Sequence, residues 1–124
     1  MRVKLSLLLS FCLSLFVGLG GAQASEGVEG TAKADKLDAC VAPTPFMRRN
    51  HFELILHQRD VTVHQGIRKT DNSLSGCVEC HVRKDVGGNH VPVDAPGEFC
   101  AACHQFTGAT LDCFTCHATT PVGN

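Results

Sequence analysis

The pattern C-x-x-C-H occurs three times in the chain, at residues 77–81, 100–104 and 113–117. Two cysteines three residues apart lie on one helical turn, so both thiols can bond to the vinyl groups of one haem while the adjoining imidazole binds the iron. The cysteines of the three motifs are Cys77, Cys80, Cys100, Cys103, Cys113 and Cys116, and the histidines are His81, His104 and His117. The motifs therefore predict three c-type haems with iron, each with one axial ligand supplied.

Two other uses of paired cysteines compete with this interpretation. A closed zinc site takes two C-x-x-C pairs, so three pairs leave one unmatched unless histidines complete it. A disulfide framework suits a small exported chain, but a pair that precedes histidine each time is typical of haem or redox chemistry. We therefore rank both alternatives below haem attachment.

The N-terminus has the features of an export signal. Arg2 and Lys4 precede an uncharged run, and Ala22-Gln23-Ala24 forms an A-x-A site that predicts cleavage directly after it. The uncharged run extends over 21 residues, 5–25, which is also long enough to span a bilayer. Residues 1–24 are thus expected to be a signal sequence or a retained membrane anchor that places the protein on the periplasmic side of the cytoplasmic membrane.

Composition limits the function and the core of the remaining 100 residues, which suffice for one domain. Beyond the leader, nine Lys and Arg face twelve Asp and Glu, a net charge of −3 with neutral histidines. This balance argues against nucleic-acid binding. Trp and Tyr are absent, so a conventional core would be thin and haems would supply the missing apolar bulk. We predict a mainly α fold with much irregular structure and little sheet, a small multihaem cytochrome c organised around three haems.

The chain divides into a lead-in and a triheme domain. Residues 25–39 are small, polar and charged, and are expected to form a flexible lead-in to a domain at 40–124. Polar residues predict a turn at 71–76, and a segment rich in glycine and proline predicts a loop at 85–97.

One longer helix is expected ahead of the motifs. Thr44 followed by Pro45 resembles an N-cap with proline at the first helical position, and the run Phe46 to Arg59 contains neither Gly nor Pro. Gly66 is the expected end of this helix, although Val61-Thr62-Val63 weakens its last part.

Three motif histidines leave three sixth coordination positions. The candidates outside the motifs are Cys40, Met47, His51, His57, His64 and His90. On a helix Met47 and His51 share a face, whereas His51 and His57 lie about 120° and 9 Å apart and cannot serve the same haem face. One helix could instead present ligands to two haems.

Each of these candidates also has a purely structural interpretation. Cys40 is the seventh cysteine beyond the leader and is either a buried apolar residue, half of an intermolecular disulfide, or a thiolate ligand. Met47 either packs under the helix or binds iron, and as the only methionine besides Met1 it must serve any His/Met haem. For His64 and His90 we favour solvated positions.

Several segments resemble a known family. The chain is similar to the DsrJ family in five segments: Cys40-Val41 through Phe46-Met47-Arg48-Arg49-Asn50-His51, His57-Gln58-Arg59-Asp60, Gly66-Ile67-Arg68, Cys77 to His81, and the closing Asp112 to Ala118. Its members are the periplasmic triheme cytochrome c subunits of the Dsr membrane complex in bacteria and archaea that reduce sulfate or oxidise sulfur. The resemblance extends over about residues 40–121.

This resemblance implies three haems with different ligands: one His/His, one His/Met and one His/Cys. Carried onto this sequence, the cysteine is Cys40, the methionine is Met47, and the distal histidine is His57, with His51 next. The resemblance also implies an uncleaved leader as membrane anchor. The implied partners are a membrane cytochrome b, a quinone-interacting membrane subunit, and periplasmic and cytoplasmic iron–sulfur subunits.

The motifs predict an electron carrier, not an enzyme in its own right, and the resemblance implies that it is a subunit of a membrane-bound sulfur-metabolism redox complex. One alternative is a haem enzyme in which Cys40 leaves its iron and a sulfur compound binds there. Another is a soluble periplasmic multihaem electron shuttle.

Overall fold

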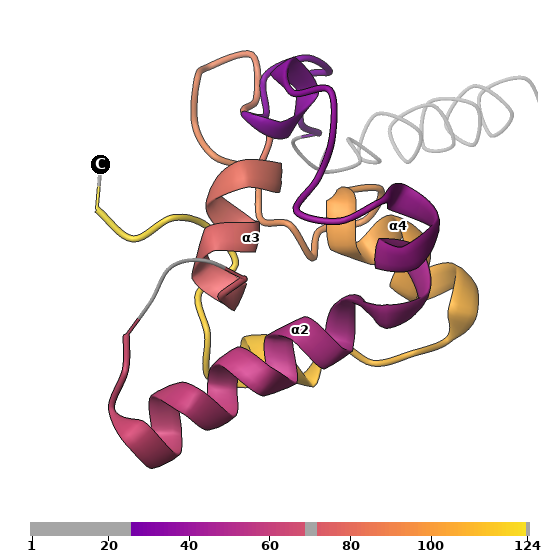
Figure 1. Cartoon of the computed structure of the whole chain (residues 1–124). Helices are drawn as coiled ribbons and strands as arrows, with labels where there is room; N and C mark the ends of the chain where they lie inside the picture. Colours follow the sequence, from indigo (N-terminus) through magenta and orange to yellow (C-terminus); the bar gives the residue numbers. More distant parts are fainter. Residues whose placement is uncertain (1–25, 69–71, 124) are drawn as a thin grey trace, which may run out of the picture.

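A computed structural model describes residues 26–68 and 72–123 (Figure 1). Its elements are the 3₁₀ helix η1 (Ala34–Lys36), the α-helices α2 (Thr44–Gln65), α3 (Leu74–His81) and α4 (Phe99–Thr107), and the 3₁₀ helix η2 (Asp112–Thr115). Within these residues no strand forms, and an isolated antiparallel bridge pairs Lys84 with His90. The prediction of a mainly helical protein with much irregular structure is confirmed.

The expected export segment, residues 1–24, lies outside the described residues, as do residues 69–71. In the part of the chain that the structure describes, no helix combines the length and apolar character needed to cross a membrane.

The helix α2 begins one residue before the expected start and ends where predicted. Pro43 has an extended conformation with ψ of 137° and takes the N-cap position, and its carbonyl accepts a 2.9 Å hydrogen bond from the amide of Phe46. Thr44, expected as the cap, is therefore the first helical residue. Gly66 ends the helix with φ of 70°, a left-handed conformation that glycine adopts without steric cost, and its amide donates to the carbonyl of Thr62.

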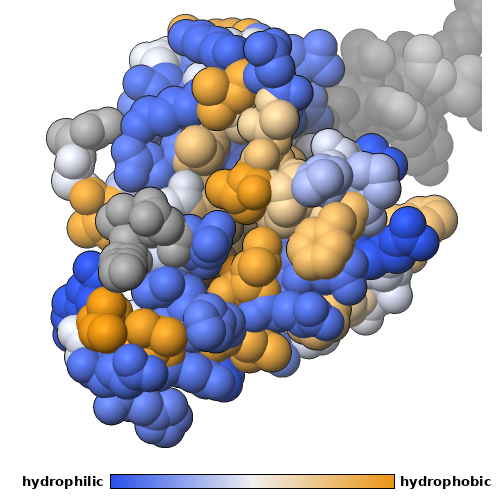
Figure 2. Space-filling model, viewed as in Figure 1, coloured by the Kyte–Doolittle hydropathy of each residue, from blue (hydrophilic) through white to orange (hydrophobic). Residues whose placement is uncertain are grey.

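No residue of α2 is buried, although the helix is 22 residues long. Its exposed large apolar side chains are Phe46, Phe52, Leu56 and Val63. Figure 2 shows apolar side chains at the surface over α2 and between α2 and the other helices. Because helices in water depend on packing of an apolar face, α2 lacks the protein core that would normally stabilise it.

The helix α3 begins inside the segment predicted as a turn. Ser73 is its N-cap, and the Ser73 Oγ accepts a 3.1 Å hydrogen bond from the amide of Gly76. The turn prediction is therefore wrong for residues 74–76, because the serine gives an otherwise unpaired amide a partner and lets the helix start early. Residues 85–97 form the predicted loop, with Gly88 and Gly97 in left-handed conformations at φ of 83° and 82°.

The core is as thin as the composition predicts. Among the described residues, the buried apolar ones are Ala32, Val78, Val82, Val91, Val93 and Ala101. Val78, Val82 and Val93 form its central cluster, against which the half-buried Leu74, Cys100 and Phe114 pack.

Residues 26–36 dock on the rest of the domain. The amide of Gly27 donates to Oε1 of Glu98 at 2.8 Å, and the amide of Val28 donates to the carbonyl of Lys84 at 2.7 Å. Residues 26–36 are therefore ordered, whereas the sequence predicted a flexible lead-in at 25–39. They are ordered because their backbone amides donate hydrogen bonds to residues far along the chain.

A buried ion pair holds this arrangement together. Arg83 donates from Nε to Oε2 and from Nη2 to Oε1 of Glu98, both at 2.9 Å, and Glu98 is only 2% exposed. Burial alone would raise the pKa of Glu98, but the hydrogen bonds from Arg83 and Gly27 and the charge of Arg83 outweigh it and lower the pKa below its usual value. A Cβ atom on Gly27 would lie 2.5 Å from Cβ of Arg83, so this close approach requires glycine.

The Arg83–Glu98 pair predicts how stability depends on pH. The pKa of Glu98 is lower in the folded than in the unfolded protein. Glu98 therefore stabilises the fold fully above a pH of about 4.3, the pKa of an unperturbed glutamate, and this stabilisation is lost as the pH falls through the pKa of Glu98 in the folded protein. Glu98→Gln should lower the free energy of unfolding at pH 7 by about 2 kcal/mol and flatten its acid dependence. Urea unfolding at a series of pH values measures both effects.

The matched control is Glu53→Gln, which changes an exposed glutamate of α2. Its free energy of unfolding should stay within about 0.5 kcal/mol of that of the wild type. Equal stability of the two variants at pH 7 would contradict the structural role of Glu98.

Candidate functional site

The three C-x-x-C-H segments meet around one apolar cluster. Val78 of the first motif lies in the cluster, and Cys100 of the second and Phe114 of the third pack against it. The first two motifs lie on the α-helices α3 and α4, and the third lies on and after the 3₁₀ helix η2. In each motif the two cysteines are about one turn apart, because both helix types place residues i and i+3 close together.

The cysteines of the described residues all carry free thiols, and they lie at Cys40, Cys77, Cys80, Cys100, Cys103, Cys113 and Cys116. Burial raises the pKa of the Cys77 thiol, and the negative charges of Cys40 and Cys80 raise it further. Burial, together with Cys77 and Asp94, raises the pKa of Cys100 to about 11. Burial therefore favours the protonated form of both thiols.

Over residues 26–68 and 72–123, no three His, Cys, Asp or Glu side chains gather into a possible metal site.

Two histidines from different helices lie side by side. The rings of His51 on α2 and His104 on α4 have centroids 5.9 Å apart and planes at 77° to each other. Metal–imidazole bonds are about 2 Å long, so two rings that bind one metal from opposite sides have centroids roughly 6 Å apart. The separation of this pair would therefore allow both imidazoles to bind one metal ion.

Hydrogen bonds fix the same tautomer in both rings. Nδ1 of His51 lies 2.9 Å from the carbonyl oxygen of Met47, and Nδ1 of His104 lies 3.3 Å from that of Ala109. Because a carbonyl only accepts, each Nδ1 carries the proton and donates it. The lone pair of each Nε2 is then available to a metal, the usual arrangement of a metal-binding histidine.

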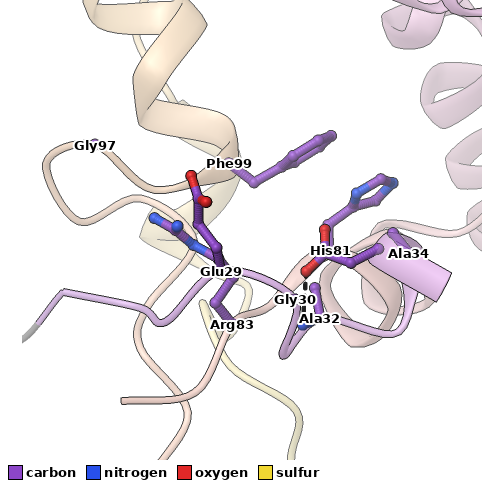
Figure 3. Close-up of a pocket in the computed structure, with 9 residues that line it drawn as sticks. Glu29, Gly30, Ala32, Ala34, His81, Arg83, Gly97 and Phe99 are labelled. Atoms are coloured by element: carbon purple, nitrogen blue, oxygen red, sulfur yellow. Dashed lines mark hydrogen bonds between the residues drawn. The ribbon is translucent and has the colours of Figure 1, made fainter. Parts of the chain in front are cut away.

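His81 lies at the end of α3 and stacks on Phe99, with ring centroids 3.7 Å apart and planes at 15°. Both rings line a cavity of about 590 Å³ (Figure 3). Its other lining residues are Glu29, Gly30, Ala32, Ala34, Asp35, Arg83 and Gly97. Burial lowers the pKa of His81, although the negative charge of Asp35 partly opposes this effect. The lowered pKa favours the neutral imidazole, which is the form that binds metals.

The remaining candidates lie in different surroundings. His117 follows η2 and is exposed, with its amide donating to the carbonyl of Cys113 at 3.0 Å. Met47 is half-buried on α2, one turn before His51, and Cys40 is exposed ahead of that helix. His57 is exposed on α2.

The two histidines expected in solvent differ from each other. His64 is exposed near the end of α2, as expected. His90 is half-buried, and its backbone pairs with Lys84 across the loop.

Sequence reasoning did not find two parts of this site. Phe99 was not singled out, although its place directly before Cys100 could have drawn attention to it. The wall that residues 29–35 form beside His81 has no signal in the sequence, because it depends on hydrogen bonds between distant segments.

Comparison with known proteins returns no match, whether to a family model, a curated protein or a solved structure.

Proposed function

We propose that this protein is a triheme cytochrome c that transfers electrons as a subunit of a membrane-bound sulfur-metabolism redox complex. The observation that carries this proposal is the meeting of three C-x-x-C-H segments on one apolar cluster. Covalently bound haem iron supplies one-electron transfer. The residues of the protein would hold the cofactors through thioether bonds, provide axial ligands and exclude water, and electron transfer itself would make or break no further covalent bond.

The shared cluster keeps the three attachment sites close together. Val78, Cys100 and Phe114 each belong to or adjoin a different motif and pack in one place. A domain of 100 residues has a radius of gyration of only about 13 Å. Groups attached to these motifs would therefore be near neighbours, the arrangement that electron transfer through a chain of cofactors requires.

The apolar surface of α2 gives independent support. A 22-residue helix with no buried residue, exposing Phe46, Phe52 and Leu56, has the surface expected of an element that packs on large apolar cofactors. Burial of such side chains stabilises a protein by about 1.5–3 kcal/mol each. Because the core holds only a few buried valines and alanines among the described residues, burial of the apolar side chains of α2 on cofactors would add substantially to the stability of the fold.

The proposal places a His/His pair at the second motif, with His104 and His51 as the ligands. His51 lies beside His104 and has its Nδ1 proton engaged with a backbone carbonyl, whereas His57 is exposed on another face of α2. This geometry favours His51 as the distal ligand, whereas the resemblance ranks His57 first and His51 second. Met47 remains the proposed ligand of a His/Met site.

Membership of a larger complex rests on the resemblance of the segments around His51 and His57 to the DsrJ family. The proposed partners are the membrane cytochrome b, the quinone-interacting subunit and the iron–sulfur subunits, with residues 1–24 as the membrane anchor. A haem enzyme acting on a sulfur compound is the second candidate. It is favoured by the exposure of Cys40, since a thiolate that leaves the iron at the surface would open a position for substrate.

The first test is the number of covalent haems. The intact mass of the purified protein should exceed that of the polypeptide by three haem groups, because each motif has both thiols and its histidine. Replacing Cys113 and Cys116 together by serine should remove one haem and leave two. A mass that fits zinc or only disulfides would refute the cytochrome proposal.

A second test distinguishes His51 from His57. In the oxidised protein, His51→Ala should change one low-spin signal in the electron paramagnetic resonance spectrum, because it removes a strong axial nitrogen. His57→Ala, six residues away on the same helix, is the matched control and should leave the spectrum unchanged. Three haems by mass in both variants would show that each remains assembled, and the reverse pattern of signals would assign the ligand to His57.

A third test concerns Cys40. Thiolate donation stabilises ferric iron, so Cys40→Ser should abolish the low-spin signal of one haem and raise the lowest of the three reduction potentials. Redox titration followed by absorbance measures the potentials, and intact mass checks that three haems remain. A variant with the spectrum and potentials of the wild type would exclude Cys40 as a ligand and remove the basis of the enzyme alternative.

A further inference from the structure

The stacking of Phe99 on His81 constrains the imidazole without covering its metal-binding atom. The two rings overlap nearly in parallel, with centroids 3.7 Å apart and planes at 15°. Rotation of the imidazole about its Cβ–Cγ bond would drive it into the phenyl ring. The lone pair of Nε2 lies in the plane of the imidazole, however, so a ring on the flat face leaves it accessible.

The backbone holds Phe99 in place from both sides. Glu98, directly before it, is buried and accepts hydrogen bonds from Arg83 and Gly27. Cys100, directly after it, donates from its amide to the carbonyl of Val93 at 3.0 Å. Phe99 is therefore the first residue of a helix whose start is fixed by several interactions.

The same interactions fix His81 relative to Phe99. His81 ends α3, and Arg83, two residues later, forms the ion pair with Glu98, which adjoins Phe99. The end of α3 and the start of α4 are thus joined twice, by a charged pair and by a ring stack. Figure 3 shows His81 and Phe99 together at the cavity that both line.

We infer that Phe99 is a positioning residue that fixes the plane of the His81 imidazole as an axial ligand of the haem on the first motif. The inference rests on the proposed function. Groups that orient an axial ligand tune the electronic properties of its metal, so Phe99 should influence the haem of the first motif although it belongs to the helix that carries the second. The stack also places the His81 ring against the residue that adjoins Cys100.

The test replaces the flat ring and keeps the rest of the site. Phe99→Leu should shift one low-spin signal of the oxidised protein and the reduction potential of one haem, because the imidazole gains freedom to turn. Phe99→Met keeps most of the side-chain volume and should give the same shift. This variant provides the test if the leucine variant does not fold well enough to be purified. Phe99→Tyr retains the ring and should keep the wild-type spectrum.

Phe106→Leu is the matched control on the same helix. Phe106 is 92% exposed, compared with 54% for Phe99, so its replacement should leave all three signals unchanged. Wild-type spectra for both Phe99→Leu and Phe99→Met, with three haems by mass, would overturn the inference and leave the cytochrome proposal intact. Absence of haem from the wild-type protein would instead refute the cytochrome proposal itself.

Discussion

The carboxylate of Glu98 accepts hydrogen bonds from the amide of Gly27 and from the guanidinium of Arg83, and Glu98 is also the N-cap residue of α4. Three separate parts of the chain therefore meet at one buried charge. A buried ion pair of this kind is costly to leave incomplete, so each partner constrains the positions of the others. Hydrogen bonds of Val28 and Thr31 with Lys84, and an ion pair between Lys33 and Glu79, join the same distant segments.

The position of the candidate site depends on this charge. The ion pair brings the end of α3 to the start of α4, which places His81 against Phe99. Gly27 brings residues 29–35 over the same region, where they form one wall of the cavity. A small set of polar contacts thus takes over part of the stabilisation that a larger apolar core provides in most domains of this length, and apolar side chains remain exposed on the surface.

The parts of the structure that depend on local chemistry could be predicted from the sequence. Gly66 ends α2 because glycine adopts a left-handed conformation easily, and the glycines and prolines of residues 85–97 prevent regular structure. The start of α3 was missed because Ser73 acts as a cap within a polar stretch that also resembles a turn.

Contacts between distant residues could not be predicted in the same way. The docking of residues 26–36 needs Glu98 and Lys84 as acceptors, and neither is marked by any pattern near Gly27. Helical geometry could separate the faces of His51 and His57, but it could not show that His51 lies beside His104, because that depends on how α2 and α4 are arranged. Likewise, the motifs identify His81 but not the ring on which it stacks.

The exposed character of α2 has a consequence for the order in which the molecule assembles. A helix with no buried residue gains little from the polypeptide alone, and the cost of starting a helix is high, so we expect α2 to form late. In the proposed cytochrome, Met47 and His51 would then reach the haems only after the thiols on the other segments had reacted. Until then the motif cysteines would stay accessible for haem attachment, and the arrival of α2 would be the last step of maturation.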